Sequence, residues 1–162
     1  MPKYSVVIPN VKETLGILKK RNYKLAIASN RPEKFSRMLI NHLGLRKYFA
    51  AVACANNKDE IKPHPRLLLK IIKKLGIKKN EVIYLGDMTI DVRAGKNAGI
   101  RTIAVVGGSS SRNELKKVDT GLHEILRKRF LLNRVFSEID LEKHRKAVLG
   151  VIEALEMFGE TE

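Results

Sequence analysis

The sequence contains little of what marks secreted, metal-rich or membrane proteins. Its one cysteine, Cys54, excludes an internal disulfide, and its four histidines show no spacing typical of metal ligands. No run of residues approaches the roughly 20 apolar side chains that a membrane-spanning helix needs. The N-terminus also lacks the basic and then apolar regions of a secretion signal. These absences predict a soluble, cytoplasmic protein with no membrane partner, in which Cys54 is a small buried apolar residue.

Acidic residues are scarce compared with basic ones. The chain of 162 residues carries 32 Lys and Arg against 17 Asp and Glu, which gives a net charge of +15. The excess lies in residues 1–118, with 25 basic and 8 acidic side chains, whereas residues 119–162 hold 7 and 9. A positive field attracts phosphorylated small molecules or nucleic acid, although lysines on solvated helix faces produce the same excess. No helix-turn-helix, zinc finger or aromatic RNA-binding strand is visible, so nucleic acid is the less favoured partner.

Short apolar runs alternate with amphipathic stretches along residues 1–118. In the stretch at 32–43, we expect Phe35, Met38 and Leu39 to face the core, together with His42 or Leu43. Strands that alternate with helices form a parallel sheet with crossover helices, so the predicted fold class is α/β, a Rossmann-like three-layer parallel sheet. The expected strands are 4–8, 24–28, 49–55, 82–85 and 101–106, and the expected helices are 11–21, 32–43, 66–75 and 92–98.

Residues 119–162 have a different character and are predicted to form a helical extension of the α/β core. One amphipathic segment runs from Leu122 to Ile139 and another from Val148 to Phe158, and Ser137 is a candidate break in the first. An amphipathic helix must bury its apolar stripe against something. These helices either pack on the sheet as a cover or present an apolar face to a partner subunit, and both interpretations stay open.

The stretch EVIYLGDMTIDVRAGKNAG, at residues 81–99, combines a strand, an acidic turn and a helix. Asp87 and Asp91 lie four residues apart, directly after the predicted strand. Ligands bind at the carboxyl ends of parallel strands, and carboxylate oxygens are the ligands that Mg²⁺ prefers. The pair therefore indicates a Mg²⁺ site. The alternative is that Thr89 caps the helix and that Asp91 merely favours its positive end.

Two further motifs follow predicted strands in the same way. Ser29 and Asn30 follow the strand at 24–28, and Lys62 comes after the next strand along the chain. A hydroxyl and a backbone N–H bind phosphate oxygens, a lysine neutralises their charge, and carboxylates hold a metal against them. Taken singly, Ser29 is better explained as a helix cap and Lys62 as a surface lysine. Together with the aspartates, the motifs predict a phosphate site with a metal.

The three motifs, in this order, resemble the haloacid dehalogenase superfamily, and most closely its phosphoglycolate-phosphatase-like branch. The matching text lies within residues 9–108 and includes PNVKETLGILKKRNYKLAIASN, KPHP and GDMTIDVRAGKNAGIRTIAVVGG. The resemblance implies a Mg²⁺-dependent phosphatase core in which Ser29 and Asn30 hold the transferring phosphoryl group. It also implies that Lys62 steadies the nucleophile and the phosphate. Asp87 would be the direct Mg²⁺ ligand, and Asp91 a second ligand or a carboxylate that holds a water.

One part of the family's pattern is missing from this sequence. The family's nucleophile is an aspartate in a DxD motif after the first strand, which becomes an aspartyl phosphate while its partner acts as acid and base. This chain contains no DxD motif, its first acidic residue is Glu13, and its first aspartate is Asp59. The segment before Pro9 is too short for the family's first strand, flap and cap domain. We therefore expect a chain that is inactive, or nearly so, by itself.

The missing strand has a central place in the family's sheet, between the strand that ends at Ser29 and the one that precedes Asp87. A gap there would leave two unpaired edges inside the sheet, which is costly for buried backbone groups. The segment 4–8 is one candidate to fill it, which would put Pro9 and Asn10 near the nucleophile's position. A second copy of the chain, or a separate polypeptide that carries the missing strand and cap, is the other.

These observations favour two functions above a third. The first is part of a truncated or split phosphatase that acts on a phosphorylated small molecule when the missing segment is supplied. The second is a non-catalytic descendant that binds a phosphorylated ligand at the retained edge, or a protein through its terminal helices. A basic nucleic-acid-binding module is the third. The substrate does not follow from the sequence, because the cap largely sets specificity in this family.

Overall fold

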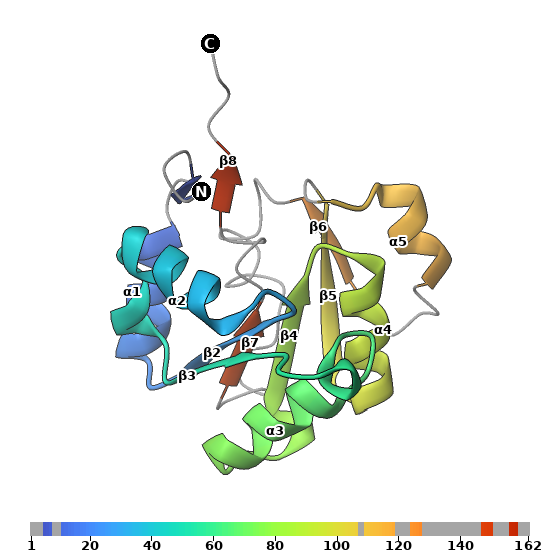
Figure 1. Ribbon diagram of the computed structural model, residues 1–162, viewed down its shortest axis with the longest axis horizontal. Coiled ribbons are helices and arrows are strands. Elements are labelled where there is room, and N and C mark those ends of the chain that lie inside the picture. Colours follow the sequence, from blue (N-terminus) through green and yellow to red (C-terminus); the bar gives the residue numbers. More distant parts are fainter. Residues whose placement is uncertain are drawn as a thin grey trace.

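The computed structural model describes residues 5–7, 11–106, 109–118, 124–127, 147–150 and 156–158 (Figure 1). The helices and strands predicted between residues 11 and 106 are confirmed, with ends that differ by at most three residues. The helices are α1 (Val11–Lys20), α2 (Glu33–His42), α3 (Arg66–Leu75), α4 (Thr89–Ala98) and α5 (Arg112–Val118). The strands are β1 (Ser5–Val7), β2 (Lys24–Ser29), β3 (Ala51–Cys54), β4 (Val82–Gly86), β5 (Arg101–Val106), β6 (Glu124–Arg127), β7 (Ala147–Gly150) and β8 (Glu156–Phe158).

The main sheet has six strands in the order β3-β2-β7-β4-β5-β6, and every neighbouring pair is parallel. All the carboxyl ends therefore lie at one edge of the sheet. The loops that follow β2 and β4 leave from this edge, on either side of β7. This topology brings residues that are far apart in the sequence to one place, as the predicted parallel sheet requires.

Helices cover both faces of the sheet (Figure 1). Leu25 and Ile27 of β2 belong to one apolar cluster with residues of α1 and α2, whereas Ala26 and Ala28 belong to another with residues of α3 and α4. Successive residues of a strand point to opposite faces, so a strand that is covered on both faces reads as an unbroken apolar run. The predicted three-layer α/β fold is confirmed.

The buried face of α2 differs from the prediction. Phe35 and Met38 were expected to face the core, but they are 56% and 42% exposed. The buried stripe instead contains Leu39, Leu43 and two residues that the prediction left out, Ser36 and Ile40. The spacing 36, 39, 40 and 43 is that of one helix face, and a buried serine within it hid the pattern. His42 lies outside the stripe and is exposed.

The gap in the middle of the sheet is filled by β7. This strand pairs with β2 on one side, with Ile27 opposite Gly150, and with β4 on the other, with Leu85 opposite Gly150. The expectation that residues 4–8 fill the gap is wrong for the part that the structure describes, because β1 pairs with β8 in a separate two-stranded antiparallel sheet. Nor is a second chain needed, since the strand comes from the same polypeptide.

The prediction of helices in residues 119–162 is wrong where the structure describes them. Residues 124–127, 147–150 and 156–158 are strands, and the first two segments belong to the main sheet. Apolar residues at helical spacing do not exclude a strand when a run is only four residues long. The rest of the predicted helices, with Ser137, lies outside the described residues, and the division of the chain at residue 118 stays a prediction.

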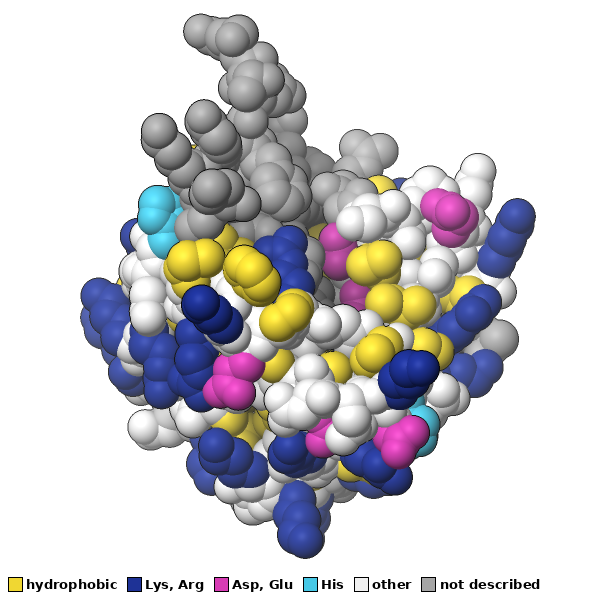
Figure 2. Space-filling view, in the orientation of Figure 1, with side chains coloured by type: hydrophobic (Ala, Val, Ile, Leu, Met, Phe, Trp, Pro, Cys, Tyr) yellow, Lys and Arg dark blue, Asp and Glu magenta, His cyan; other side chains and the backbone are white. Residues whose placement is uncertain are grey.

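Several basic side chains lie at the carboxyl ends of helices. Lys19 and Lys20 lie in the last turn of α1, and Lys73 and Lys74 in the last turn of α3. Figure 2 shows Lys and Arg on the left, lower and right parts of the face in view. This distribution agrees with lysines that favour the negative ends of helices. Within the described part of the chain, no helix is long and apolar enough to cross a membrane.

Candidate functional site

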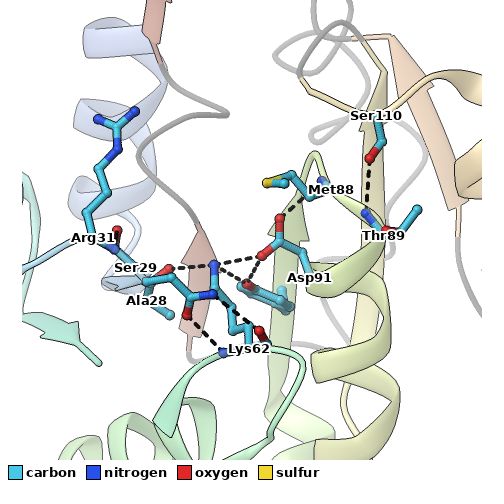
Figure 3. Close-up of polar contacts among 10 residues, drawn as sticks. Ala28, Ser29, Arg31, Lys62, Met88, Thr89, Asp91 and Ser110 are labelled. Atoms are coloured by element: carbon cyan, nitrogen blue, oxygen red, sulfur yellow. Dashed lines mark hydrogen bonds and ion pairs between the residues drawn. The ribbon is translucent and has the colours of Figure 1, made fainter. Parts of the chain in front are cut away.

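Four of the predicted site residues lie at the carboxyl edge of the sheet, and Figure 3 shows three of them, Ser29, Lys62 and Asp91. Ser29 ends β2, Asp87 directly follows β4, Asp91 lies in the first turn of α4, and Lys62 lies in the loop between β3 and α3. All four are at most 5% exposed. Charged side chains are seldom this buried unless they are paired or bind a ligand, so the cluster is a candidate functional site.

The ammonium group of Lys62 is held at three points. Its Nζ lies 2.7 Å from Asp91 Oδ1, with which it forms a salt bridge. The same Nζ donates to the backbone carbonyl of Ala28 at 3.2 Å and to the hydroxyl of Tyr84 at 3.4 Å. A lysine has three N–H donors, so each has an acceptor in this arrangement. The interpretation of Lys62 as a surface lysine is thereby wrong.

Both oxygens of Asp91 accept hydrogen bonds. The Tyr84 hydroxyl donates to Oδ1 at 2.9 Å, beside the Lys62 ammonium, and the backbone N–H of Met88 donates to Oδ2 at 3.1 Å. The second of these bonds is a helix-capping interaction, because Met88 immediately precedes α4. Asp91 therefore supports the start of the helix and pairs with Lys62 as well. The expectation that Thr89 caps the helix is wrong, because Met88 is the N-cap and Thr89 is the first residue of α4.

A loop after β5 holds Asp87. The backbone N–H of Ser109 donates to Asp87 Oδ2 at 3.2 Å, and that of Ser110 donates to the Asp87 carbonyl at 3.3 Å. The Ser110 hydroxyl also accepts from the Thr89 N–H at 3.2 Å, so it caps α4 from a distant part of the chain. These serines were not among the predicted site residues, although a polar run directly after a buried strand was the available signal.

Gly86 permits the close approach of β4 to α4. A Cβ atom at this position would lie 2.2 Å from Asp91 Cβ and 2.8 Å from Asp91 Cγ, which is far inside van der Waals contact. The glycine between the strand and Asp87 is therefore needed for packing at the site. Any larger residue would push Asp91 away from its partners.

Ser29 and Asn30 contact their surroundings in different ways. The Ser29 hydroxyl accepts a hydrogen bond from the Arg31 N–H at 3.1 Å, and α2 has no side-chain cap, so the reading of Ser29 as the cap of that helix is wrong. Asn30 is directed at Lys62. Its Oδ1 accepts from the Lys62 N–H at 2.9 Å, and its Nδ2 donates to the Lys62 carbonyl at 3.3 Å.

The loop that carries Lys62 is anchored by Glu60. The backbone N–H of Asn56 donates to Glu60 Oε2 at 2.9 Å, and Lys70 lies 3.3 Å from Glu60 Oε1. The Asn56 hydrogen bond, followed by the contact with Lys70, lowers the pKa of Glu60 below its ordinary value of 4.5. Glu60 thus stays ionised at neutral pH and links the start of this loop to α3.

The donors at the site fit a hard cation. Mg²⁺ is commonly bound through one or two carboxylates, with waters completing its shell. Asp87 supplies a buried carboxylate at the end of a strand, whereas both oxygens of Asp91 already accept protein hydrogen bonds. Asp87 and Asp91 are thus the two carboxylates of the site that could hold such a cation, directly or through a water. In the described part of the chain, no three His, Cys, Asp or Glu residues are grouped as metal ligands.

The sequence and the fold correspond to a known family. A model of the haloacid dehalogenase-like hydrolases matches residues 3–105, which is more than half of the chain, so the chain belongs to this family. Its phosphoglycolate-phosphatase-like character is also confirmed. Over 104 residues it is 34% identical to the phosphoglycolate phosphatase of Haemophilus influenzae, and over 102 residues it is 31% identical to that of Escherichia coli.

These relatives are longer than the chain. The matches cover 64% and 63% of the chain, but only 46% and 40% of the two phosphatases. A predicted phosphoglycolate phosphatase from Haemophilus somnus has a similar structure, with a TM-score of 0.66, 28% identity, and coverage of 73% of this chain and 52% of that one. The fold is also that of a HAD phosphatase from Thermococcus onnurineus, with a TM-score of 0.65 and 24% identity over 85% of this chain and 59% of that one.

Proposed function

We propose that the chain forms the phosphate- and metal-binding part of a phosphomonoester hydrolase and does not hydrolyse phosphomonoesters by itself. The main support is the pair of Lys62 and Asp91 at 2.7 Å, buried beside Ser29 and Asp87 at one sheet edge. A buried ion pair costs desolvation energy, and placing one among residues that suit an anion and a cation is typical of a binding site. The names of the relatives, which are phosphatases, also support a phosphate-binding site.

Each residue has a role in this proposal. The Ser29 hydroxyl would donate to a phosphoryl oxygen, and Lys62 would offset the negative charge of the ligand. Asp87 would hold Mg²⁺, which when bound supplies positive charge to phosphoryl oxygens and fixes their orientation. Asp91 would keep Lys62 and the metal's water in place. The ligand would be a small phosphorylated molecule, in keeping with the names of the relatives.

The expected lack of hydrolysis rests on the missing nucleophile motif. The sequence has no DxD motif, and β7, which lies between β2 and β4, contains no acidic residue. Among the described residues, no acidic side chain belongs to the strand between β2 and β4, so we expect no phosphoryl transfer from a ligand to the protein. A further polypeptide segment would have to provide the nucleophile.

A non-catalytic binding protein is the second candidate. The observation in its favour is that β7 of this chain already occupies the middle of the sheet, so the sheet is continuous without a strand from another polypeptide. Such a protein would bind a phosphorylated ligand and release it unchanged. Association with a second copy or another chain, and a cytoplasmic location, stay predictions.

Hydrolysis of p-nitrophenyl phosphate tests the proposal. The purified chain is assayed with and without Mg²⁺, beside an Asp87→Ala variant whose folding is checked by circular dichroism. We expect no Mg²⁺-dependent turnover. Turnover that requires Mg²⁺ and disappears in the variant would mean that the chain contains its own nucleophile. It would overturn the proposal that the chain does not hydrolyse phosphomonoesters by itself.

A further inference from the structure

Asn30 holds both backbone polar groups of Lys62. Its side-chain oxygen accepts the Lys62 N–H at 2.9 Å, and its side-chain nitrogen donates to the Lys62 carbonyl at 3.3 Å. A carboxamide has the same donor and acceptor as a peptide group, so Asn30 pairs with Lys62 as a neighbouring strand would. The two residues are 32 positions apart and belong to the loops after β2 and β3.

This contact fixes the point from which the Lys62 side chain starts. From there the side chain runs to Nζ, which is bonded to Asp91, Tyr84 and Ala28 on three sides. A lysine side chain has four flexible carbon–carbon bonds, and a shift of its backbone changes which acceptors the ammonium reaches. The buried position of Nζ therefore depends on the position of the loop backbone.

Other contacts hold the same loop without touching Lys62. Glu60 accepts from the Asn56 N–H near the start of the loop. On the far side, the Nδ2 of Asn97 donates to the carbonyl of Pro63 at 3.1 Å from an exposed position. Among the described contacts, those from Asn30 are the ones made to the backbone of the lysine itself. Asn97 is thus a matched comparison, because it is the same residue type and acts on the next peptide group.

We propose that Asn30 is a positioning residue for Lys62 rather than a direct ligand of the phosphoryl group. The geometry assigns its carboxamide to the loop backbone, so it sets where the lysine ammonium stands relative to Asp91 and the ligand. The role in ligand binding rests on the proposed function of the site. The effect on Lys62 itself does not, and it is tested separately.

The first test measures the accessibility of Lys62. Lysines of the full chain are acetylated with a limiting reagent, and the rate at each site is read by mass spectrometry, with exposed Lys19 as the internal reference. The variants are Asn30→Ala, Asn30→Asp and Asn97→Ala. Loss of two net hydrogen bonds raises the fraction of open loop about 5- to 150-fold, and the acetylation rate of Lys62 should rise in proportion.

The variants have distinct expected results. Asn30→Ala gives the full increase, and Asn30→Asp gives a smaller one, because it keeps the acceptor for the Lys62 N–H and loses the donor. Asn97→Ala changes the Lys62 rate less than about threefold, since it removes one exposed hydrogen bond. Unchanged acetylation of Lys62 in a folded Asn30→Ala variant, or an equal increase in Asn97→Ala, overturns the proposal. If Asn30→Ala does not fold, Asn30→Asp decides on the same criteria.

The second test measures binding of inorganic phosphate with Mg²⁺ by calorimetry. A positioning role predicts that Asn30→Ala weakens binding about tenfold and that Asn97→Ala leaves it unchanged. Tight binding by Asn30→Ala despite fast acetylation of Lys62 contradicts the role in the site. If the unmodified chain binds no phosphate but the acetylation result holds, the proposed function fails and the positioning of Lys62 by Asn30 stands.

Discussion

The buried pair of Lys62 and Asp91 makes a quantitative prediction about stability. Their side chains are 4% and 2% exposed, and the charged atoms lie 2.7 Å apart. Replacing one member leaves the other charge buried without its counter-ion, which costs about 3–5 kcal/mol. We expect Lys62→Met and Asp91→Asn each to lower the free energy of unfolding by about this amount, because Asn at 91 keeps hydrogen bonds but not the charge.

The double variant separates an ion pair from two independent losses. Combining Lys62→Met with Asp91→Asn removes both charges, so no buried charge is left uncompensated. The double variant should be no less stable than either single variant, whereas independent effects would add to about 6–10 kcal/mol. The coupling energy of the cycle is then about 3 kcal/mol or more.

Urea denaturation followed by circular dichroism measures all four proteins. For a chain of this size, about 1 kcal/mol corresponds to a shift in Tm of about 2–4 °C, so thermal melts give an independent check on each single variant. The prediction is refuted if the two losses in free energy of unfolding are strictly additive, or if both single variants lose less than about 1 kcal/mol. Either result would mean that water reaches the pair and screens it.

Three further predictions follow from the fold and the loop. Leu149→Pro in β7 should lower the free energy of unfolding, measured by urea denaturation, by about 3 kcal/mol or more, because β7 pairs on both sides. Leu126→Pro in the edge strand β6 should lower it less, and equal losses would contradict the central place of β7. Gly95→Ala should lower the free energy of unfolding by at least about 1–3 kcal/mol, because its Cβ would lie 1.8 Å from Thr102 Oγ1. Adding Thr102→Ala should restore part of this loss, and a Gly95→Ala variant of unchanged stability would refute the close contact. The lowered pKa of Glu60 means that its contribution to stability is complete above pH 4.5 and is lost as the pH falls through the folded-state pKa. In urea denaturation, the unmodified chain should therefore be more stable than Glu60→Gln at neutral pH but not in acid. A stability difference that persists in acid would contradict the lowered pKa of Glu60.

The sequence predicts the α/β part of the fold because its signals are local. Each strand between residues 24 and 106 is a short apolar run, and each helix has a buried stripe, so period and length suffice. The site at the carboxyl edge follows from the same topology. Ser29, Lys62, Asp87 and Asp91 meet because parallel strands end together, which needs no knowledge of individual contacts.

The central strand could not be predicted in this way. β7 is a run of four residues, AVLG, in a stretch whose apolar residues also suit a helix. What makes it a strand is pairing with β2 and β4 on both sides, and those partners lie more than 60 residues away in the sequence. A local pattern carries no information about such partners. The assignment of residues 4–8 to the gap failed for the same reason.

The supporting residues of the site were missed because their roles are tertiary. Tyr84 reads as one more apolar residue of a buried strand, yet its hydroxyl donates to Asp91. Asn30 reads as a ligand-facing residue at a strand end, yet its carboxamide contacts the Lys62 backbone. The exposed Phe35 shows the reverse error, in which an apolar residue was assigned to the core although it lies on the outer face of α2.

Binding of inorganic phosphate tests the central claim most directly. Calorimetric titration is carried out on the unmodified chain, Lys62→Met and Asp87→Ala, each with and without Mg²⁺. The account predicts that the unmodified chain binds phosphate only when Mg²⁺ is present, and that each substitution weakens binding at least about tenfold. Absence of Mg²⁺-dependent binding by the folded, unmodified chain, or equal binding by all three proteins, would contradict it.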